Sequence, residues 1–148
     1  ERAARAGAIA ETRLLDPDRE AAMLADWAGK ADAVLIDAPC SGTGTWRRNP
    51  EARWRLSPAA IARYAATQAR LLRVAADLVR PGGRLTYIVC SLLDAEGADG
   101  VAAFLAERPD WRSDLPAMPA GRARGSGWRL TPAHDGTDGF FFSTLRRL

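Results

Sequence analysis

The sequence predicts an α/β domain, in which helices pack on an open, largely parallel sheet. Residues 33–36 form a continuous apolar run of strand length, which is typical of strands buried on both faces of a parallel sheet. Residues 58–79 place apolar side chains at helical spacing. Strand and helix patterns alternate along the rest of the chain, as in doubly wound sheets. We expect the 148 residues to form one domain, 1–148.

The first forty residues are expected to alternate between helix and strand. The expected elements are a helix end at 1–8, a strand at 9–15, a helix at 16–27 and a strand at 33–36. Gly7 suits the C-cap of the first helix, and Pro17 suits the first turn of the second.

The rest of the chain alternates in the same way after a long loop at 38–56. The expected elements are a helix at 58–79, a strand at 84–89, a helix at 95–107, a connection at 112–127 and a strand at 140–145. Ser57 is a good N-cap, and Pro58 fits the first helical position. The sequence Pro-Gly-Gly after the long helix predicts a turn into the next strand.

Three chemically active side chains directly follow expected strands: Asp16, Asp37 and Cys90. In open α/β sheets, ligands bind outside the carboxyl ends of the strands, so these residues predict a site there. The glycine-rich loop after Asp37 lets backbone approach a ligand, but it has neither the phosphate-loop spacing nor the dinucleotide fingerprint. Taken singly, Asp37 also suits a turn, and Cys40 suits a small buried hydrophobe.

Charge is distributed unevenly along the chain. Residues 41–90 have a net charge of +7, whereas 1–40 and 91–148 have net charges of −3 and −1. This pattern favours a polyanionic partner. Solvated helix faces in an arginine-rich protein, in which Lys30 is the only lysine, are an equal alternative on charge alone.

Several classes of protein are excluded. No apolar run reaches the roughly 18 residues that a membrane span needs. Two cysteines make no disulfide framework, and no leader is present, so reduced thiols and a cytoplasmic location are expected. The single histidine, His134, and two separated cysteines make no zinc set, so no metal is expected.

Four segments together carry a specific resemblance. They are DAPCSGTGTWRRNPEARW at 37–54, QARLL at 68–72, RPGGRLTYIVCSLLDAEG at 80–97 and TDGFF at 137–141, preceded by RLTP at 129–132. In order and spacing they resemble the RNA cytosine-5 methyltransferases of the NOL1/NOP2/Sun family, and especially its bacterial ribosomal RNA members. The resemblance implies a Rossmann-like fold, S-adenosylmethionine as cofactor and RNA, above all ribosomal RNA, as partner.

The resemblance also implies a covalent mechanism. Cytosine C5 is a poor nucleophile, so a thiolate adds to C6 and turns C5 into a carbon that can accept a methyl group. By resemblance Cys90 is this nucleophile, and Cys40 is the cysteine needed to release the product. Asp37 faces N3 of the base. Asp16, Asp37 and Pro39 are the implied cofactor contacts.

RNA is expected to reach the site along the basic loop. Arg47, Arg48 and Arg53, interleaved with Trp46, suit phosphate contact and base stacking. The target base must be single-stranded or flipped out. For Trp54, stacking on RNA and packing onto the body are equal alternatives.

The sequence departs from the family in three ways. Val89 stands where the family usually has threonine, and Gly97 stands where it commonly has asparagine after Glu96. The family's glycine-rich cofactor loop, and the acidic residue that holds the ribose, do not occur in this sequence. We therefore expect the carboxyl-terminal half of a catalytic domain, weak binding of S-adenosylmethionine, and a strand edge at 33–37 that is open to self-association.

Two other functions are kept as alternatives. An acidic-x-Pro-x turn also serves methyltransferases that act on exocyclic amines, and for these the thiol of Cys90 is dispensable. A non-catalytic RNA-binding remnant would use the basic loop alone, and its RNA binding would depend on salt but not on cofactor.

Overall fold

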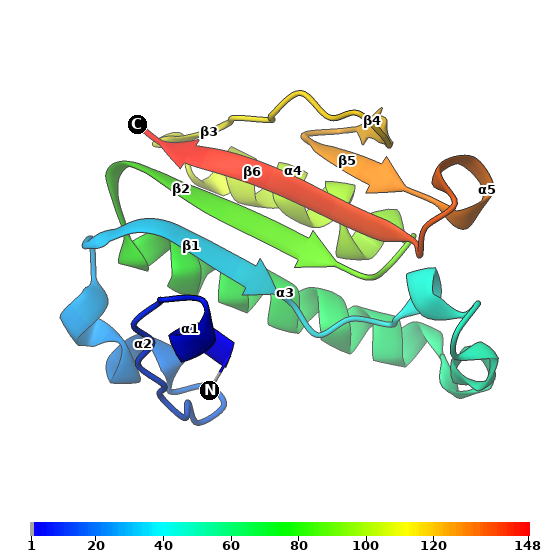
Figure 1. Ribbon diagram of the computed structural model, residues 1–148, viewed down its shortest axis with the longest axis horizontal. Coiled ribbons are helices and arrows are strands. Elements are labelled where there is room, and N and C mark those ends of the chain that lie inside the picture. The colour runs from blue at the N-terminus through cyan, green and yellow to red at the C-terminus, as the bar shows by residue number, and fades with distance from the viewer. Residues whose placement is uncertain (1) are drawn as a thin grey trace.

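Six strands form one sheet in the computed structural model, which describes residues 2–148 (Figure 1). The strands are β1 (Ala31–Asp37), β2 (Val79–Val89), β3 (Trp111–Ser113), β4 (Arg122–Arg124), β5 (Gly127–Leu130) and β6 (Phe140–Arg147). Their order is β1-β2-β6-β5-β4, and β3 also pairs with β6. Only β1 and β2 run parallel; all other pairs are antiparallel. The parallel pair brings the segments after Asp37 and after Val89 to one edge.

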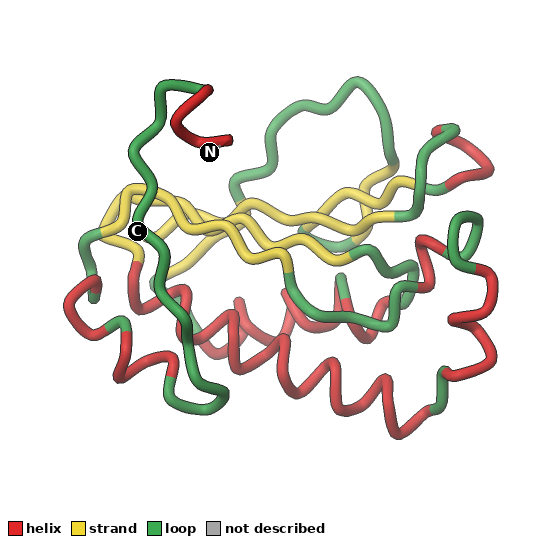
Figure 2. Tube along the Cα trace, turned by 60° about the horizontal axis from the view of Figure 1, so that its bottom comes forward, coloured by secondary structure: helices red, strands yellow, loops and turns green. Residues whose placement is uncertain are grey.

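The two long helices pack on the same face of the sheet (Figures 1 and 2). They are α3 (Pro58–Leu78) and α4 (Ala98–Glu107). The short helices are α1 (Arg2–Arg5), α2 (Glu20–Met23) and α5 (Pro132–Asp135), and the 3-10 turns are η1 (Ala25–Trp27), η2 (Thr43–Thr45), η3 (Pro50–Arg55) and η4 (Asp94–Glu96). A doubly wound sheet carries helices on both faces; here the long ones share one face.

The core lies between this face and α3. Leu72 of α3, Leu85 and Tyr87 of β2, and Phe141 and Leu145 of β6 are completely buried. The rings of Tyr87 and Phe141 meet edge to face, with centroids 6.5 Å apart. This packing fixes the ends of β2 and β6, and therefore the loops that follow β2 and precede β6.

Several expected elements are confirmed. Strands at 33–36, 84–89 and 140–145 lie within β1, β2 and β6. The long helix begins as expected, since the Ser57 side chain accepts a hydrogen bond from the amide of Ala60 at 3.2 Å. Gly7 follows α1 with φ of +70°, as a C-cap glycine does.

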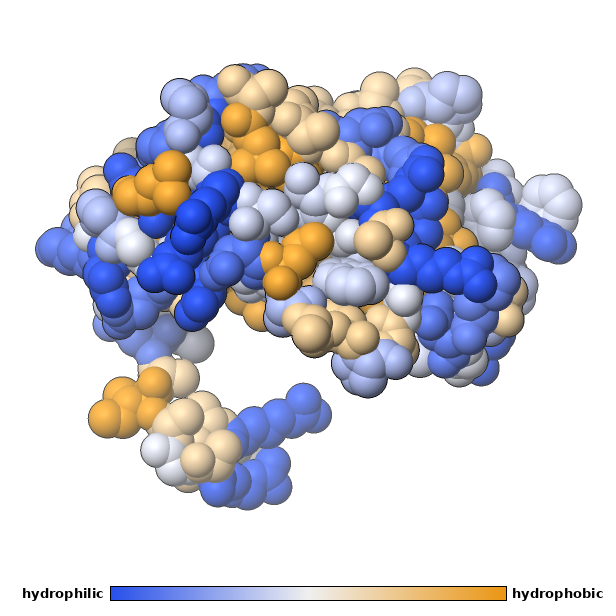
Figure 3. All heavy atoms as spheres, turned by 90° about the horizontal axis from the view of Figure 1, so that it is seen from above, coloured by the Kyte–Doolittle hydropathy of each residue, from blue (hydrophilic) through white to orange (hydrophobic). Residues whose placement is uncertain are grey.

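The strand expected at 9–15 is wrong. Ile9 and Leu14 are almost fully exposed, and the segment pairs with no strand in the part of the chain that the structure describes. A strand forms only where a neighbour satisfies its backbone groups, and this segment has none. The N-terminal helix accordingly stands apart from the sheet in Figure 2, and a small lobe projects from the body in Figure 3.

The single helix expected at 16–27 is also wrong, since only the short elements α2 and η1 form there. Asp18 has φ of +65°, which a right-handed helix does not allow. The connection expected at 112–127 contains β4 and the ends of β3 and β5. Strands of three or four residues are too short to show a hydrophobic period, so the sequence did not reveal them.

Candidate active site

The two cysteines meet at the carboxyl ends of β1 and β2. Cys40 follows β1 after two residues, and Cys90 follows β2 directly. Their Sγ atoms lie 3.3 Å apart, and both thiols are free and partly exposed. The two cysteines are 50 residues apart in the sequence. They meet because β1 and β2 pair in parallel, with Asp37 opposite Ile88. Two thiols in contact at the carboxyl ends of these strands can share a proton and can both reach one bound substrate.

The environment of Cys40 favours the protonated thiol. Burial raises its pKa to about 12, and the neighbouring Cys90 and Glu96 act in the same direction. Cys40 therefore keeps its proton at neutral pH. Its S–H group can donate that proton to a neighbouring atom.

A buried carboxylate, Glu96, lies beside both cysteine loops. It is completely buried on η4, and its two oxygens accept from the amide of Ser41 at 2.8 Å and from the hydroxyls of Ser41 and Ser91, each at 2.5 Å. Ser41 and Ser91 directly follow Cys40 and Cys90. Sequence reasoning did not include Glu96 in the site. The available signal was its place within the segment 80–97 that carries the resemblance, six residues after Cys90.

Backbone contacts hold the loop of Cys40 in place. The side chain of Gln68 on α3 donates to the carbonyl of Pro39 at 2.9 Å. The amide of Gly44 donates to the carbonyl of Cys90 at 3.0 Å, and the amide of Gly139 donates to the carbonyl of Gly44 at 2.8 Å. A Cβ atom on Gly44 would lie 1.9 Å from the Gly139 oxygen, so this crossing needs glycine.

The two expected acidic contacts lie near one groove beside β1. Asp37, at the exposed end of β1, lines a groove of about 300 Å³ with Leu15 and Ile36. Asp16 follows Leu15 and is exposed, 3.8 Å from Arg19. The prediction that Asp16 follows a strand is wrong, because no strand precedes it among the described residues. Among the described residues, neither carboxylate is hydrogen-bonded to a cysteine.

The basic loop divides into a paired part and an open part. Arg47 and Arg48 form ion pairs with Asp138, at 3.2 Å for Arg47, while their side chains remain more than 60% exposed. The guanidinium of Arg53 stacks 4.5 Å from the ring centroid of Trp54, which is 77% exposed. Trp54 therefore does not pack the loop onto the body.

The structure shows how Trp46 is placed, and it explains two of the three departures from the family pattern, those at Val89 and Gly97. The indole nitrogen of Trp46 is buried without a protein partner, so this ring does pack inward. Val89 is completely buried in the core, where a threonine hydroxyl would need a partner. A Cβ on Gly97 would lie 2.7 Å from the Phe141 ring, so no larger residue fits without a shift.

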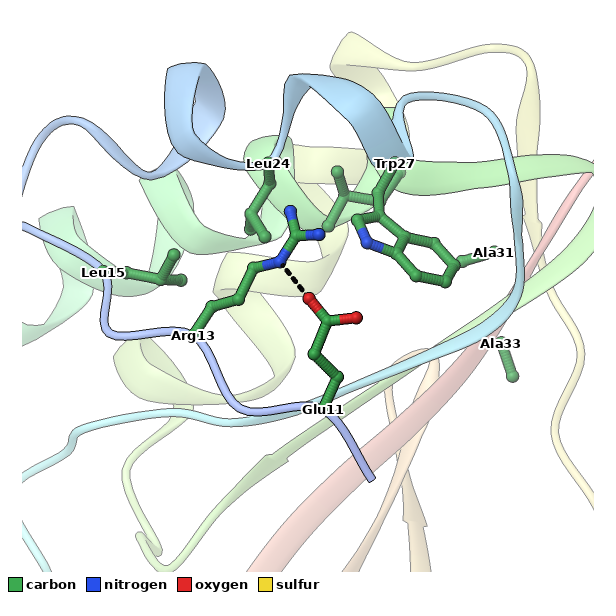
Figure 4. Close-up of a pocket in the computed structure, with 8 residues that line it drawn as sticks. Glu11, Arg13, Leu15, Leu24, Trp27, Ala31 and Ala33 are labelled. Carbon is green, nitrogen blue, oxygen red and sulfur yellow. Dashed lines mark hydrogen bonds and ion pairs between the residues drawn. The ribbon is translucent and has the colours of Figure 1, made fainter. Parts of the chain in front are cut away.

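A hollow of about 370 Å³ is lined by residues other than the cysteines. It is bounded by β1, Trp27 and the segment that contains Glu11 and Arg13, whose side chains form a 2.9 Å ion pair (Figure 4). Within residues 2–148, no helix is long and apolar enough to cross a membrane. The same residues contain no group of three metal-ligating side chains.

Known structures share this architecture. A crystal structure titled PH0851 superposes with a TM-score of 0.87 at 34% identity, covering 98% of this chain and 33% of that one. NSun6 from Pyrococcus horikoshii, crystallised with SFG, gives a TM-score of 0.76 at 28% identity, covering 98% and 36% of the two chains. The fold is therefore the Rossmann-like fold of S-adenosylmethionine-dependent methyltransferases.

Sequence comparison identifies the family. The family model described as 16S rRNA methyltransferase RsmB/F matches residues 7–146. Ribosomal RNA small subunit methyltransferase B of Thermus thermophilus is 48% identical over 121 residues, and that of Shewanella oneidensis is 37% identical over 120. Each match covers 80% of this chain but only 30% and 28% of the relatives' lengths. The chain belongs to the RsmB/F methyltransferase family.

Proposed function

We propose that this chain carries the catalytic cysteines of an enzyme that methylates cytosine C5 in RNA, with ribosomal RNA in the cytoplasm as the substrate. The observation that carries the proposal is the 3.3 Å contact between Cys40 and Cys90 at the carboxyl ends of two parallel strands. Membership of an rRNA methyltransferase family supports the RNA substrate. The two-thiol contact supports C5 chemistry, since methylation of an exocyclic amine needs no thiol.

In the proposed reaction, the thiolate of Cys90 adds to C6 of the base, and the electrons of the C5–C6 double bond become available at C5. Once C5 is methylated, a base such as solvent water takes its proton, the electrons of that C–H bond re-form the C5–C6 double bond, and the bond from C6 to the Cys90 sulfur breaks. Cys40 keeps its own proton beside Cys90 and is positioned to donate a hydrogen bond to the departing sulfur, and in this way it is proposed to assist release of the product. Asp37 is proposed to stabilise the base protonated at N3.

The groove beside β1 fits part of S-adenosylmethionine. Leu15 and Ile36 give it apolar walls that suit an adenosine group, and the carboxylate of Asp37 can accept hydrogen bonds from polar atoms. Asp16 and Pro39 are proposed to border the same ligand. When bound, the cofactor supplies an electrophilic methyl group. The relative crystallised with SFG, an analogue of this cofactor, supports the assignment.

RNA is proposed to reach Cys90 across the basic loop. The exposed pair of Arg53 and Trp54 suits a phosphate contact and the stacking of an unpaired base. Arg47 and Arg48 complete the proposed contact region, whereas Trp46, whose indole nitrogen is buried, packs inward instead of stacking on RNA. The open edge of β1 is a separate surface, through which two copies can associate.

The proposal is tested with the whole gene product that contains this chain. We would incubate it with S-adenosylmethionine and unmodified small-subunit ribosomal RNA, digest the RNA to nucleosides and analyse them by mass spectrometry. We expect 5-methylcytidine. N4-methylcytidine would indicate an amine methyltransferase, and RNA binding without any methylated nucleoside would indicate a binding remnant; either result contradicts the proposal.

A further inference from the structure

We propose that Glu96 is a positioning residue, whose carboxylate ties the loop of Cys40 to the turn of Cys90 and sets the two thiols side by side. This inference rests on the proposed function, because that function requires the thiols of Cys40 and Cys90 to lie side by side. Glu96 touches neither thiol through a hydrogen bond. It acts through Ser41 and Ser91, the residues that directly follow the two cysteines.

The first argument is the way in which the charge is buried. Glu96 is completely buried, and no Lys or Arg within residues 2–148 forms an ion pair with it. Burying a carboxylate is costly unless hydrogen bonds replace its hydration. Here the replacement comes from Ser41, through both its amide and its hydroxyl, from the hydroxyl of Ser91, and at 3.4 Å from Gln68. All of these neighbours belong to the cysteine loops or brace them.

The second argument is the donor–acceptor direction of the hydrogen bonds around Glu96. A carboxylate only accepts hydrogen bonds, so the hydroxyl of Ser91 must donate to it and is left to accept from its other neighbours. Those neighbours are the amide of Leu93 and the hydroxyl of Thr43, each at 3.1 Å, and the hydroxyl oxygen of Ser41 lies 3.3 Å away. The oxygen of Thr43 accepts in turn from the amide of Leu92 at 2.9 Å. The charge on Glu96 thus orients a chain of hydrogen bonds that fixes the turn after Cys90.

The third argument is that Glu96 is itself held rigidly. The hydroxyl of Tyr87, buried in the core, donates to the Glu96 carbonyl at 2.6 Å. Gly97 packs directly against Phe141. The carboxylate is therefore a fixed point on the core, to which both cysteine loops are attached, and small displacements of such supports lower reaction rates strongly.

The first test measures thiol positioning on this chain without any methylation. We would treat the chain with oxidised dithiothreitol, which takes up two electrons and two protons as the Cys40–Cys90 disulfide forms, then alkylate it and follow the disulfide by mass spectrometry. Glu96→Gln keeps the side-chain shape and removes the charge. We expect disulfide formation to slow by about tenfold or more. Asp94→Asn, on the same turn but paired outward with Arg124 and Arg129, is the matched control and should change the rate less than about twofold.

The second test uses the whole gene product and RNA that contains 5-fluorocytidine, from which a cytosine-5 enzyme cannot eliminate fluorine and so stays bound to the base. The final amount of adduct reports the folded fraction, and its rate of formation reports positioning. We expect Glu96→Gln to reach the wild-type amount at a rate lowered by about tenfold or more. A wild-type rate, or a loss of amount that matches a loss of folded protein, would overturn the inference.

Failure of this inference can be distinguished from failure of the proposed function and from misfolding of the variant. If the wild-type protein forms no adduct, the proposed function fails, while the disulfide rates still decide whether Glu96 positions the thiols. If Glu96→Gln does not fold, by circular dichroism, Ser41→Ala and Ser91→Ala each remove one link of the network. Unchanged disulfide rates in both serine variants would then contradict the inference.

Discussion

Two regions of the sheet differ in how many of their polar and apolar groups have partners. One lies at the carboxyl ends of β1 and β2, where the cysteines meet, and the other is the outer strand β1 itself. At the carboxyl ends of β1 and β2, the carboxylate of Glu96 accepts hydrogen bonds from Ser41, which lies 55 residues away in the sequence, and from the nearby Ser91. Along β1, Leu35 is 65% exposed, and the preceding segment around Leu14 pairs with no described strand. Among the residues that the structure describes, the loops of the two thiols therefore have their hydrogen-bond partners, whereas the outer side of β1 has no partner strand.

The largest effect on the cysteine edge is expected from Gly44→Ala. The added Cβ would meet the Gly139 carbonyl at 1.9 Å, and backbone on both sides leaves no flexible atom to move away. We expect a loss of about 3 kcal/mol in the free energy of unfolding, measured with urea. Gly100→Ala is the control, since open space surrounds that position in α4 and alanine favours helix. Equal stability of the two variants would disprove the close approach of the Gly44 and Gly139 backbones.

A smaller loss is expected from Tyr87→Phe, which removes the hydrogen bond to the Glu96 carbonyl and leaves that buried oxygen without this donor. The free energy of unfolding should fall by about 1 to 2 kcal/mol. Tyr64→Phe is the matched control, because Tyr64 is half-buried on α3 and should change stability by less than about 0.5 kcal/mol. A Tyr87 variant as stable as this control would show that the turn of Glu96 is not anchored there.

The raised pKa of Cys40 predicts how stability and thiol reactivity at the cysteines depend on pH. Its pKa of about 12 lies above that of a free thiol, so the folded state holds the proton more tightly. The resulting stabilisation is complete below about pH 8.5 and is lost as the pH rises toward 12. At pH 8, alkylation of Cys40 by iodoacetamide should be at least about tenfold slower in the folded chain than in urea, as followed by peptide mass spectrometry. Equal alkylation rates in the folded chain and in urea would contradict a raised pKa of the Cys40 thiol.

The smallest effect is expected on the β1 side, from Leu14→Ser. This side chain is 89% exposed and belongs to no strand, so its replacement should change the free energy of unfolding by less than about 0.5 kcal/mol. Leu85→Ala, in the buried core of β2, should cost about 3 kcal/mol in the same urea titration. A large effect of Leu14→Ser would show that the N-terminal segment packs on the body.

The sequence predicted the elements whose signals are local. The apolar run within β1 and the Ser57 cap of α3 depend on neighbouring residues, so both were found. The strand expected at 9–15 has a good local pattern but lacks a partner strand among the described residues. Glu96 was missed for the opposite reason, because its partner Ser41 lies 55 residues away and meets it only through the pairing of β1 and β2.

The cysteines themselves were singled out by a resemblance together with their place after strands, and their roles stay predictions. The 5-fluorocytidine trap tests them most directly, in the whole gene product with S-adenosylmethionine and RNA. We predict a denaturation-resistant protein–RNA adduct that disappears in Cys90→Ala and still forms in Cys40→Ala, because only Cys90 is proposed to bond to C6. An adduct that persists without Cys90, or no adduct from wild-type protein that binds RNA and cofactor, would contradict the account.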